Sequence, residues 1–282
     1  MKVPTNAAVT VGTFDGVHIG HRRLIQSTVD FAKKTGVKSC VIAINNQSKK
    51  LTPTDVQNEI LHEMGVEIVV SQDFTDDFKN LVPTDFFEIY LKNCKYIVVG
   101  VDFKFGRSRL GDVELLRSLA KNAIVNVIPP VTTDGLTVSS SAIRSAIYEG
   151  DFQLAEKMLG RSYAVGGIVQ RGDQIGKQLG FPTVNIAVKE HMVLPPKGVY
   201  VCQTEYNGEM YDSITNYGGK PTVKDSLDMI ETHLLNFDRE IYGEKIAVRF
   251  VEKIRDIKTF SSKDELIIQL NKDKIKIIEK NI

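Results

Sequence analysis

The stretch from Ala7 to Leu24, AAVTVGTFDGVHIGHRRL, constrains the fold of this chain more than any other. It starts as a short apolar strand, passes through a glycine turn and opens a helix, because apolar residues recur at helical spacing from Leu24 to Ala32. The start of a helix presents unpaired backbone N–H groups and the positive end of the helix dipole. Anions are favoured there, so the stretch predicts an anion site directly after the first strand.

Two imidazoles lie in the opening of this helix. His18 and His21 are three residues apart, and Gly20 between them lets the backbone approach a bulky phosphate. The imidazoles can add donors that point at phosphoryl oxygens. Together, these features indicate a site for a nucleotide α-phosphate. A histidine here can also be a simple capping residue, and His-x-x-His can be a metal pair. No third metal ligand follows at convincing spacing, however.

The rest of the first half alternates between apolar strands and helices. The expected strands are 38–44, 67–71, 96–100 and 123–128, and the expected helices are 54–64, 85–91 and 111–121. Thr84, after Pro83, is the expected N-cap of the helix 85–91. Continuously apolar strands that alternate with helices favour a parallel sheet covered on both faces, with ligands at the carboxyl ends of the strands.

Two later stretches are expected at the same edge of the sheet. The loop 100–107, GVDFKFGR, combines the carboxylate of Asp102 with aromatic and cationic residues, although it can also be an ordinary polar loop. The segment 138–144, VSSSAIR, places hydroxyls at a helix start, where they most often only cap the helix. Arg144, one helical turn further, could reach the same anion as those hydroxyls.

From Tyr163 the pattern changes to short alternating runs separated by Gly, Asn and Asp turns. Such runs favour an antiparallel sheet or a small closed barrel. A last helix is expected over 261–278, where Ser262 and Glu265 are spaced as a capping box. We place the domain boundary near Gly160, which gives domains 1–159 and 160–282.

The second domain has its chemical residues in two places. The stretch 166–185, GGIVQRGDQIGKQLGFPTVN, could form a loop whose N–H groups wrap phosphates, although glycine-rich loops are usually just turns. Thr183 and Asn185 are two apart in a strand, so both can offer oxygen to Mg²⁺ from the same side. Glu231, inside an apolar strand, is either an edge residue facing solvent or a general base for a hydroxyl.

Composition excludes several classes of protein. A net charge of +1 over 282 residues gives no broad field for nucleic acid or a membrane surface. The three cysteines, Cys40, Cys94 and Cys202, are scattered and suggest reduced thiols. We expect neither a signal peptide nor a membrane-spanning run, and therefore a cytoplasmic protein without nucleic-acid or membrane partners. The oligomeric state stays open.

The first half resembles a known family. GTFDGVHIGH closely resembles the signature of the nucleotidylyltransferases, and TFDGVHIGH resembles bacterial FAD synthetases in particular. The loop after residue 100 and the segment 138–144 resemble the GxDFxFG and (I/V)SSTxxR motifs of that family, with Ser141 in place of the usual Thr. The resemblance implies catalytic roles for His18 and His21. The implied nucleotide-binding residues are Gly12, Phe14, Asp15, Gly20, Asp102, Ser139, Ser140, Ser141 and Arg144.

One part of the first half departs from the family. After the second strand the family usually has an aromatic–Pro–His–Pro turn that lines the flavin side of the site, whereas this chain has INNQSKK over 44–50. Lys49 and Lys50 are candidates to replace it.

The second half is similar to riboflavin kinase over essentially all of 160–282. The motifs GFPTxN, NxGxxPT, ExHLL, Tyr242-Gly243 and IRxxxKF follow in the family's order. The resemblance implies that Thr183 and Asn185 hold Mg²⁺ and phosphate and that Glu231 is the base. The implied ATP-binding residues are Gly172, Lys177 and Tyr242, and the implied flavin-bordering residues are Arg255, Lys258 and Phe260.

Nearly the whole chain thus resembles the bacterial bifunctional riboflavin kinase/FAD synthetase family. This implies a Rossmann-like α/β parallel-sheet nucleotidyltransferase domain followed by a small antiparallel β-barrel domain with a C-terminal helix. The implied substrates are riboflavin, FMN and ATP, with Mg²⁺ as cofactor. Two alternatives remain: a riboflavin kinase whose first domain binds nucleotide without making FAD, and a first domain that only senses nucleotide or flavin.

Overall fold

The computed structural model describes residues 3–46, 48–172, 176, 179–188, 191–218 and 229–278. The chain divides into two compact units, Met1–Ala142 and Ile143–Ile282. None of the helices in the described ranges combines the length and apolarity needed to cross a bilayer.

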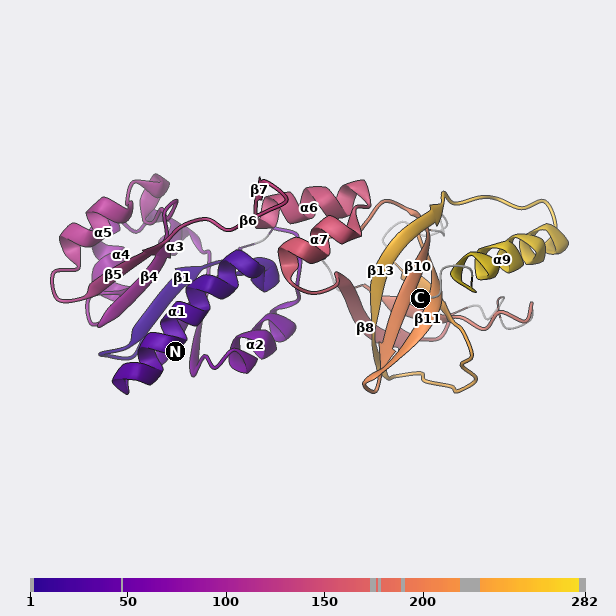
Figure 1. Cartoon of the computed structure of the whole chain (residues 1–282), viewed down its shortest axis with the longest axis horizontal. Coiled ribbons are helices and arrows are strands. Elements are labelled where there is room, and N and C mark those ends of the chain that lie inside the picture. Colours follow the sequence, from indigo (N-terminus) through magenta and orange to yellow (C-terminus); the bar gives the residue numbers. More distant parts are fainter. Residues whose placement is uncertain are drawn as a thin grey trace. The chain divides into compact units, whose positions relative to one another are not determined.

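Unit 1 is built on a five-stranded sheet (Figure 1). The strand order is β3-β2-β1-β4-β5, and neighbouring strands are parallel. Its strands are β1 (Ala8–Gly12), β2 (Ser39–Asn45), β3 (Ile68–Asp73), β4 (Tyr96–Gly100) and β5 (Ile124–Ile128), and β6 (Thr132–Thr133) and β7 (Leu136–Thr137) form a separate hairpin. Its helices are η1 (Asp15–Val17), α1 (Ile19–Thr35), α2 (Thr54–Glu63), α3 (Asp76–Asn80), α4 (Pro83–Tyr90), η2 (Arg107–Arg109) and α5 (Val113–Leu119). The expected parallel α/β sheet is confirmed.

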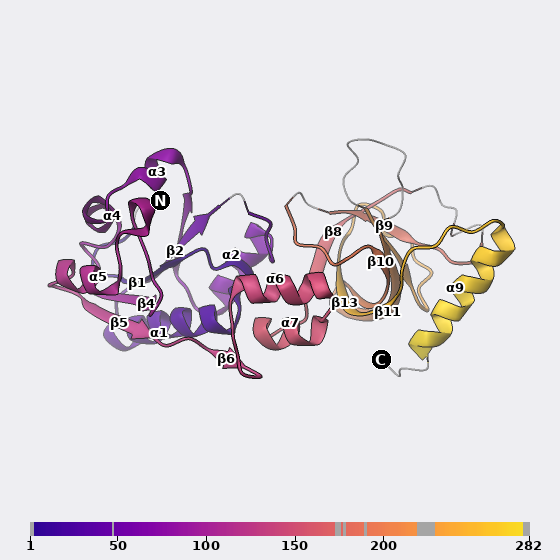
Figure 2. The same ribbon diagram turned by 90° about the horizontal axis from the view of Figure 1, so that it is seen from above.

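Both faces of this sheet are covered, which explains why its strands are continuously apolar. Along β2, Cys40 and Ile42 belong to a buried cluster with side chains of α3, α4 and α5. Val41 and Ala43 belong to a second cluster, with side chains of α1 and α2. Figure 2 shows the same arrangement from above, with the strands between the two groups of helices.

The strand order reverses between β1 and β4. From β1 the chain adds β2 and then β3 on one side, and it later adds β4 and β5 on the other. In open α/β sheets, ligands bind outside the carboxyl ends of strands at such a switch point. The two connections that leave this point carry His18 and Asp102.

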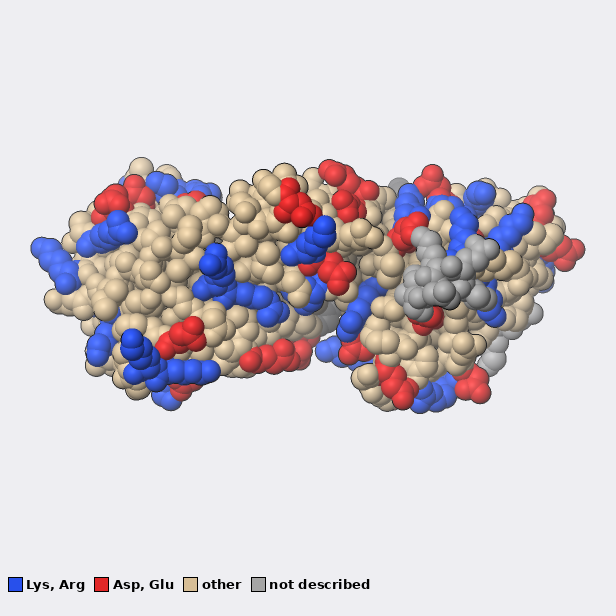
Figure 3. Space-filling view, viewed as in Figure 1, with Lys and Arg blue, Asp and Glu red and all other residues tan. Residues whose placement is uncertain are grey.

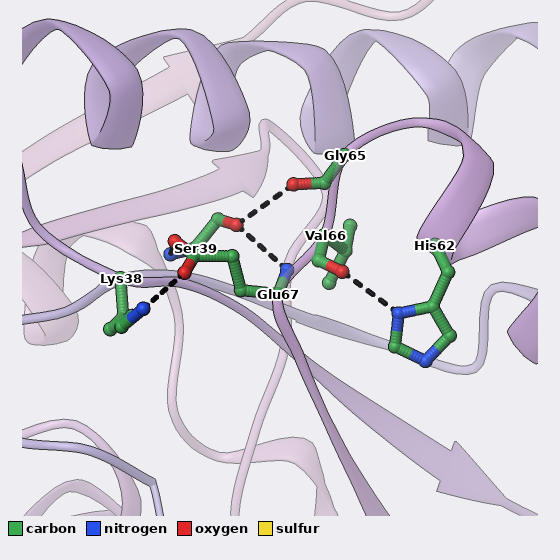
Figure 4. Close-up of polar contacts among 6 residues, drawn as sticks. All are labelled: Lys38, Ser39, His62, Gly65, Val66 and Glu67. Atoms are coloured by element: carbon green, nitrogen blue, oxygen red, sulfur yellow. Dashed lines mark hydrogen bonds and ion pairs between the residues drawn. The ribbon is translucent and has the colours of Figure 1, made fainter.

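The opposite end of β2 is closed by structural hydrogen bonds (Figure 4). The buried Ser39 hydroxyl donates to the Gly65 carbonyl at 3.1 Å and accepts from the Glu67 amide at 3.0 Å. Nδ1 of His62, at the end of α2, lies 2.9 Å from the Val66 carbonyl. Lys38 pairs with Glu67 and lowers the pKa of that carboxyl. These bonds fix the connection from α2 to β3, away from the switch point.

One predicted helix cap is wrong. Helix α4 starts at Pro83 with Val82 as its N-cap, and no side chain caps it, so Thr84 lies inside the first turn. Proline has its φ preset for the first helical position and lacks the N–H that would need a partner there.

Unit 2 contains a closed barrel with the order β10-β11-β12-β9-β8-β13. Its strands are β8 (Ala164–Gln170), β9 (Val184–Ala187), β10 (Gly198–Tyr206), β11 (Glu209–Tyr217), β12 (Met229–Leu234) and β13 (Lys245–Arg255). Its helices are α7 (Phe152–Leu159) and α9 (Lys263–Ile278), while α6 (Ser140–Glu149) contains the division between the units. Figure 2 looks into the barrel, with α9 along its side. The predicted barrel with a C-terminal helix is confirmed, whereas the boundary at 159/160 stays a prediction.

The two sides of the barrel wall differ. Thr215 and Thr232 are fully buried and bond to each other through their hydroxyls. Their neighbours along β11 and β12, Asn216 and Glu231, pair with each other in register and are partly exposed. Because successive residues of a strand point to opposite sides, Asn216 and Glu231 lie on the outer face.

Helix α9 covers another part of that outer face. Ile277 packs with Val199 and Ile214, and Arg255 forms a salt bridge of 2.8 Å with the fully buried carboxylate of Asp273. The N-terminus of α9 is capped as predicted by Ser262, which accepts from the Glu265 amide at 3.2 Å. The Glu265 carboxylate reaches back to the amide of the residue before the cap.

The surface and the thiols match the composition. On the face shown in Figure 3, basic and acidic side chains are interspersed, without a large field of one sign. Cys40, Cys94 and Cys202 are free and buried, and burial raises the pKa of each thiol to about 12. They are therefore unreactive at neutral pH.

Candidate active sites

The turn after β1 is strained. Phe14, Gly16 and Val17 have φ angles of 47°, 82° and 40°. A β-branched residue such as valine rarely adopts a positive φ, and such strain persists only where the surroundings enforce it.

Three hydrogen bonds from distant segments enforce this turn. The buried side chain of Gln57 in α2 donates to the Thr13 carbonyl at 2.9 Å. The Asp15 carboxylate accepts from the amide of Leu51 at 2.8 Å, and the Asp15 carbonyl accepts from the Ser140 hydroxyl at 3.0 Å. The segment with the serines is thereby joined to the histidine turn, as the sequence predicted.

The two histidines are stacked. His18 is the N-cap of α1, and its Nδ1 accepts from the His21 amide at 3.2 Å, so its neutral ring carries the proton on Nε2. The two rings lie 3.5 Å apart and nearly parallel, at 16°. The edge of Phe14 contacts His21 at a centroid distance of 5.2 Å. Burial, followed by the nearby His18, lowers the pKa of His21 well below its usual value. His21 is thus a neutral ring at neutral pH, at the positive end of a helix.

Gly20 and Phe14 help to position the two histidine rings. A Cβ at Gly20 would lie 3.2 Å from the His18 ring, so glycine leaves room for the ring itself. Phe14 is fully buried and supports His21 from within the core. A Cβ at Gly12 would lie 3.3 Å from the Phe14 ring.

The other predicted nucleotide residues of the first half differ in their environments. Ser139 accepts from the Ala142 amide at 3.1 Å and caps α6, while Ser141 is exposed. Arg144 follows one turn later on α6 and is partly buried. Asp102 is exposed, and its carboxylate folds back to 2.8 Å from where a Cβ of Gly100 would be.

The segment that replaces the family's Pro-His-Pro turn is polar and tied to β3. The Asn45 amide donates to the Ser71 hydroxyl at 2.6 Å and to the Asp73 carboxylate at 3.3 Å. The Lys50 amine donates to the Thr54 hydroxyl at 2.6 Å. Gln47 lies outside the described residues.

In unit 2, three polar side chains form a row across neighbouring strands of the outer face. Asn185 of β9 pairs with Glu231 of β12, which pairs with Asn216 of β11. The Thr183 hydroxyl donates to the Glu231 carboxylate at 2.9 Å. The side-chain oxygen of Asn216 is buried, and no described residue hydrogen-bonds to it. The row therefore gathers three oxygen-bearing side chains, those of Thr183, Asn185 and Asn216, around the carboxylate of Glu231.

Two described glycines of the glycine-rich stretch, Gly172 and Gly176, leave no room for a side chain. A Cβ at Gly172 would lie only 2.2 Å from the Asn185 amide, and a Cβ at Gly176 would lie 2.4 Å from the Phe181 carbonyl. No side chain fits at either position, which is how backbone reaches a ligand-binding surface. The predicted Lys177 lies outside the described residues.

The remaining predicted residues lie at the margins of this row. The Tyr242 ring stands 5.3 Å from the guanidinium of Arg171, directly before Gly172, so it borders the glycine loop. All three guanidinium nitrogens of Arg255 bind the chain itself, namely the Asp273 carboxylate and the Asp256 carbonyl. Lys258 is exposed and Phe260 is half-buried.

The sequence patterns predict no role for Gln57, Asn216 or His233. Gln57 lies 44 residues from Thr13, whose carbonyl it binds, so no local sequence pattern predicts the contact. Asn216 and His233 stood within the NxGxxPT and ExHLL motifs, and their strand register with Glu231 was the available signal. Within the described residues, no three His, Cys, Asp or Glu side chains cluster as a metal site would require.

Family models match both halves of the chain. A model described as FAD synthetase matches residues 1–142, and one described as riboflavin kinase matches residues 159–280.

Curated relatives match over nearly the whole chain. The bifunctional riboflavin kinase/FMN adenylyltransferase of Bacillus subtilis is 32% identical over 95% of this chain and 90% of its own length. The protein of the same name from Escherichia coli K12 is 33% identical over 95% and 90%, respectively. A solved structure titled as a macrolide-efflux protein from Streptococcus pneumoniae has a TM-score of 0.86 and 30% identity, and the match covers 97% of this chain and 94% of that one.

Proposed function

The chain belongs to the family of bifunctional riboflavin kinase/FMN adenylyltransferases, and we propose that its two reactions take place at the two sites described above. It phosphorylates riboflavin to FMN with ATP, and it adenylylates FMN to FAD with a second ATP, releasing pyrophosphate. Both family models match and the curated relatives are bifunctional, which supports both activities rather than kinase activity alone.

The adenylyltransferase site is the start of α1. The observation that carries this proposal is the stacked pair His18 and His21 at a helix N-terminus beside the switch point of the sheet. The phosphate of FMN is itself the nucleophile and attacks the α-phosphate of ATP, so no enzyme nucleophile is needed. The Nε2–H of His18 and the first-turn amides of α1 donate to phosphoryl oxygens, and the resemblance assigns the leaving phosphates to Ser140 and Arg144 of α6.

The kinase site is the outer row of the barrel. Glu231 accepts the proton of the ribityl 5′-hydroxyl, which attacks the γ-phosphate of ATP. The Thr183 hydroxyl, 2.9 Å from the carboxylate, orients it. Gly172 lets the loop backbone approach the phosphates, Tyr242 borders the nucleotide, and Arg255, Lys258 and Phe260 border the flavin. Transfer of this kind depends mostly on positioning and electrostatics.

The oxygens of this row fit a magnesium ion. Thr183 and Asn185 offer neutral oxygens, and the buried Asn216 oxygen has no hydrogen-bond partner among the described residues. Mg²⁺ prefers oxygen ligands and keeps several waters, so two or three such oxygens suffice beside the phosphates. When bound, the ion would neutralise charge on the transferring phosphoryl group. We place the protein in the cytoplasm, where its free thiols stay reduced.

Product analysis tests both assignments. Incubation with riboflavin, ATP and Mg²⁺, followed by separation of FMN from FAD, should give both products from the unmodified chain. Glu231→Gln should lower the rate of FMN formation by about 10²–10⁴-fold while the chain stays folded. A folded Glu231→Gln variant with normal turnover would remove Glu231 from the mechanism. Accumulation of FMN without FAD would instead favour the kinase-only alternative.

A further inference from the structure

His233 lies next to the kinase row without belonging to it. It follows Glu231 by two residues on β12, so both side chains point to the same, outer face of the barrel. Its partner in register on β11 is Ile214, which packs against α9. His233 thus occupies the strip of wall between Glu231 and the C-terminal helix.

The imidazole of His233 holds the segment in front of the row. Its Nδ1 lies 2.7 Å from the Pro182 carbonyl, and the ring meets Phe181 edge to face at a centroid distance of 5.5 Å. A carbonyl oxygen can only accept a hydrogen bond, so the proton is on Nδ1. Both contacts reach consecutive residues of the loop that ends at Thr183.

A short covalent path connects this contact to the base. The carbonyl that His233 binds belongs to the peptide bond of Pro182 with Thr183, and the Thr183 hydroxyl binds Glu231. The two hydrogen bonds therefore clamp residues 182 and 183 against β12 at two points, His233 and Glu231. Proline has no backbone N–H to donate, so its carbonyl is the backbone group that can form a hydrogen bond at this position.

We propose that His233 is a positioning residue of the kinase site, which fixes the segment Phe181 to Thr183 so that the Thr183 hydroxyl stays on Glu231. This inference rests on the kinase function proposed above. Burial and the nearby Lys274 of α9 lower the pKa of His233, although the Pro182 carbonyl opposes this. The contact needs only the Nδ1 proton, which the neutral ring of this tautomer already carries.

Three variants test the proposal in steady-state kinetics with riboflavin and Mg-ATP. His233→Ala should lower kcat or raise KM for Mg-ATP by about tenfold, because misplaced reacting groups lose rate steeply. His233→Asn places an amide N–H near the position of Nδ1 and should recover most of the loss. FAD formation from FMN, measured on the same preparations, should not change. The matched control is His62→Ala in unit 1, which removes a similar Nδ1 contact, to the Val66 carbonyl at 2.9 Å, whereas the row around Glu231 lies in unit 2 (Figure 4).

Several outcomes would overturn the proposal. These are normal kcat and KM in His233→Ala, an Asn variant as defective as the Ala variant, or an equal loss in His62→Ala. Because His233→Ala could fail to fold, the ring nitrogens of His233 are also observed by ¹⁵N NMR in the unmodified chain. A neutral ring with its proton on Nδ1 supports the bond, whereas a proton on Nε2 with a bare Nδ1 excludes it. Normal activity in Glu231→Gln would refute the proposed base separately, whatever the His233 variants show.

Discussion

At the scale of single residues, one hydrogen bond determines which nitrogen of His18 can donate at the first proposed site. The His21 amide donates to Nδ1 of His18, and this fixes which His18 nitrogen carries the proton. The sequence predicted two donors at a helix start, and it did so from their spacing alone. It could not predict the stacking of the rings, which depends on the strained turn and on Phe14.

Gly20→Ala tests whether room for His18 matters. The added Cβ would lie 3.2 Å from the imidazole and displace it by a few tenths of an ångström. Alanine is a better helix former than glycine by about 1 kcal/mol, so stability should hold or rise. We expect FAD formation to fall about tenfold while FMN formation is unchanged. Unimpaired FAD formation would show that the position of His18 is not critical.

Acid should destabilise unit 1 through His21. Folding lowers the pKa of His21 below its ordinary value of 6.5. At a pH between the folded and the ordinary pKa, the unfolded chain therefore binds more protons than the folded chain. Stability therefore falls as the pH drops below about 6.5, by at most about 1.4 kcal/mol per pH unit for one group. Urea unfolding across this range should give a shallower pH dependence for His21→Asn than for the unmodified chain. His233 contributes equally to the pH dependence of both proteins. Identical pH slopes for the unmodified chain and His21→Asn would therefore contradict the role assigned to His21.

At the scale of elements, the sequence predicted most strands and helices but not the bonds that hold them in register. Strands such as β4 were found because they are apolar throughout. The helix α3 and the Pro83 start of α4 were missed, because short elements and caps depend on a few residues. The contacts of Gln57 with Thr13 and of Arg255 with Asp273 join residues 44 and 18 positions apart, beyond any local pattern.

The bond from Arg255 to Asp273 should anchor α9. The Asp273 carboxylate is fully buried and the Arg255 side chain is 13% exposed, so Asp273→Asn leaves a buried cation without its counter-ion. We expect a loss of about 3 kcal/mol in the free energy of unfolding of unit 2, measured by urea denaturation. The control is Asp256→Asn, which removes an exposed ion pair with Lys253 and should cost less than about 1 kcal/mol. Equal losses in the two variants would show that the buried pair has no special role.

At the scale of the whole molecule, the motifs predicted two activities, and the stacked histidines and the row around Glu231 lie in separate units. His18→Ala should abolish most FAD formation and leave FMN formation nearly unchanged, since loss of such a donor typically costs about 3–4 kcal/mol of barrier. A mixture of the His18→Ala and Glu231→Gln chains should convert riboflavin to FAD, because FMN made by one chain can diffuse to the other. Product separation after each incubation checks this, and joint loss of both activities in either single variant would contradict the two-site assignment.

The proposed reacting groups of the barrel lie on the outside of its wall, while Thr215 and Thr232 are buried on the inside. Closure of the barrel and the chemistry proposed on it therefore depend on alternate residues of the same strands. Substitutions can accumulate in one set while the other is left alone. Mutations on the outer face can thus change the substrate preference while the residues that close the barrel stay the same.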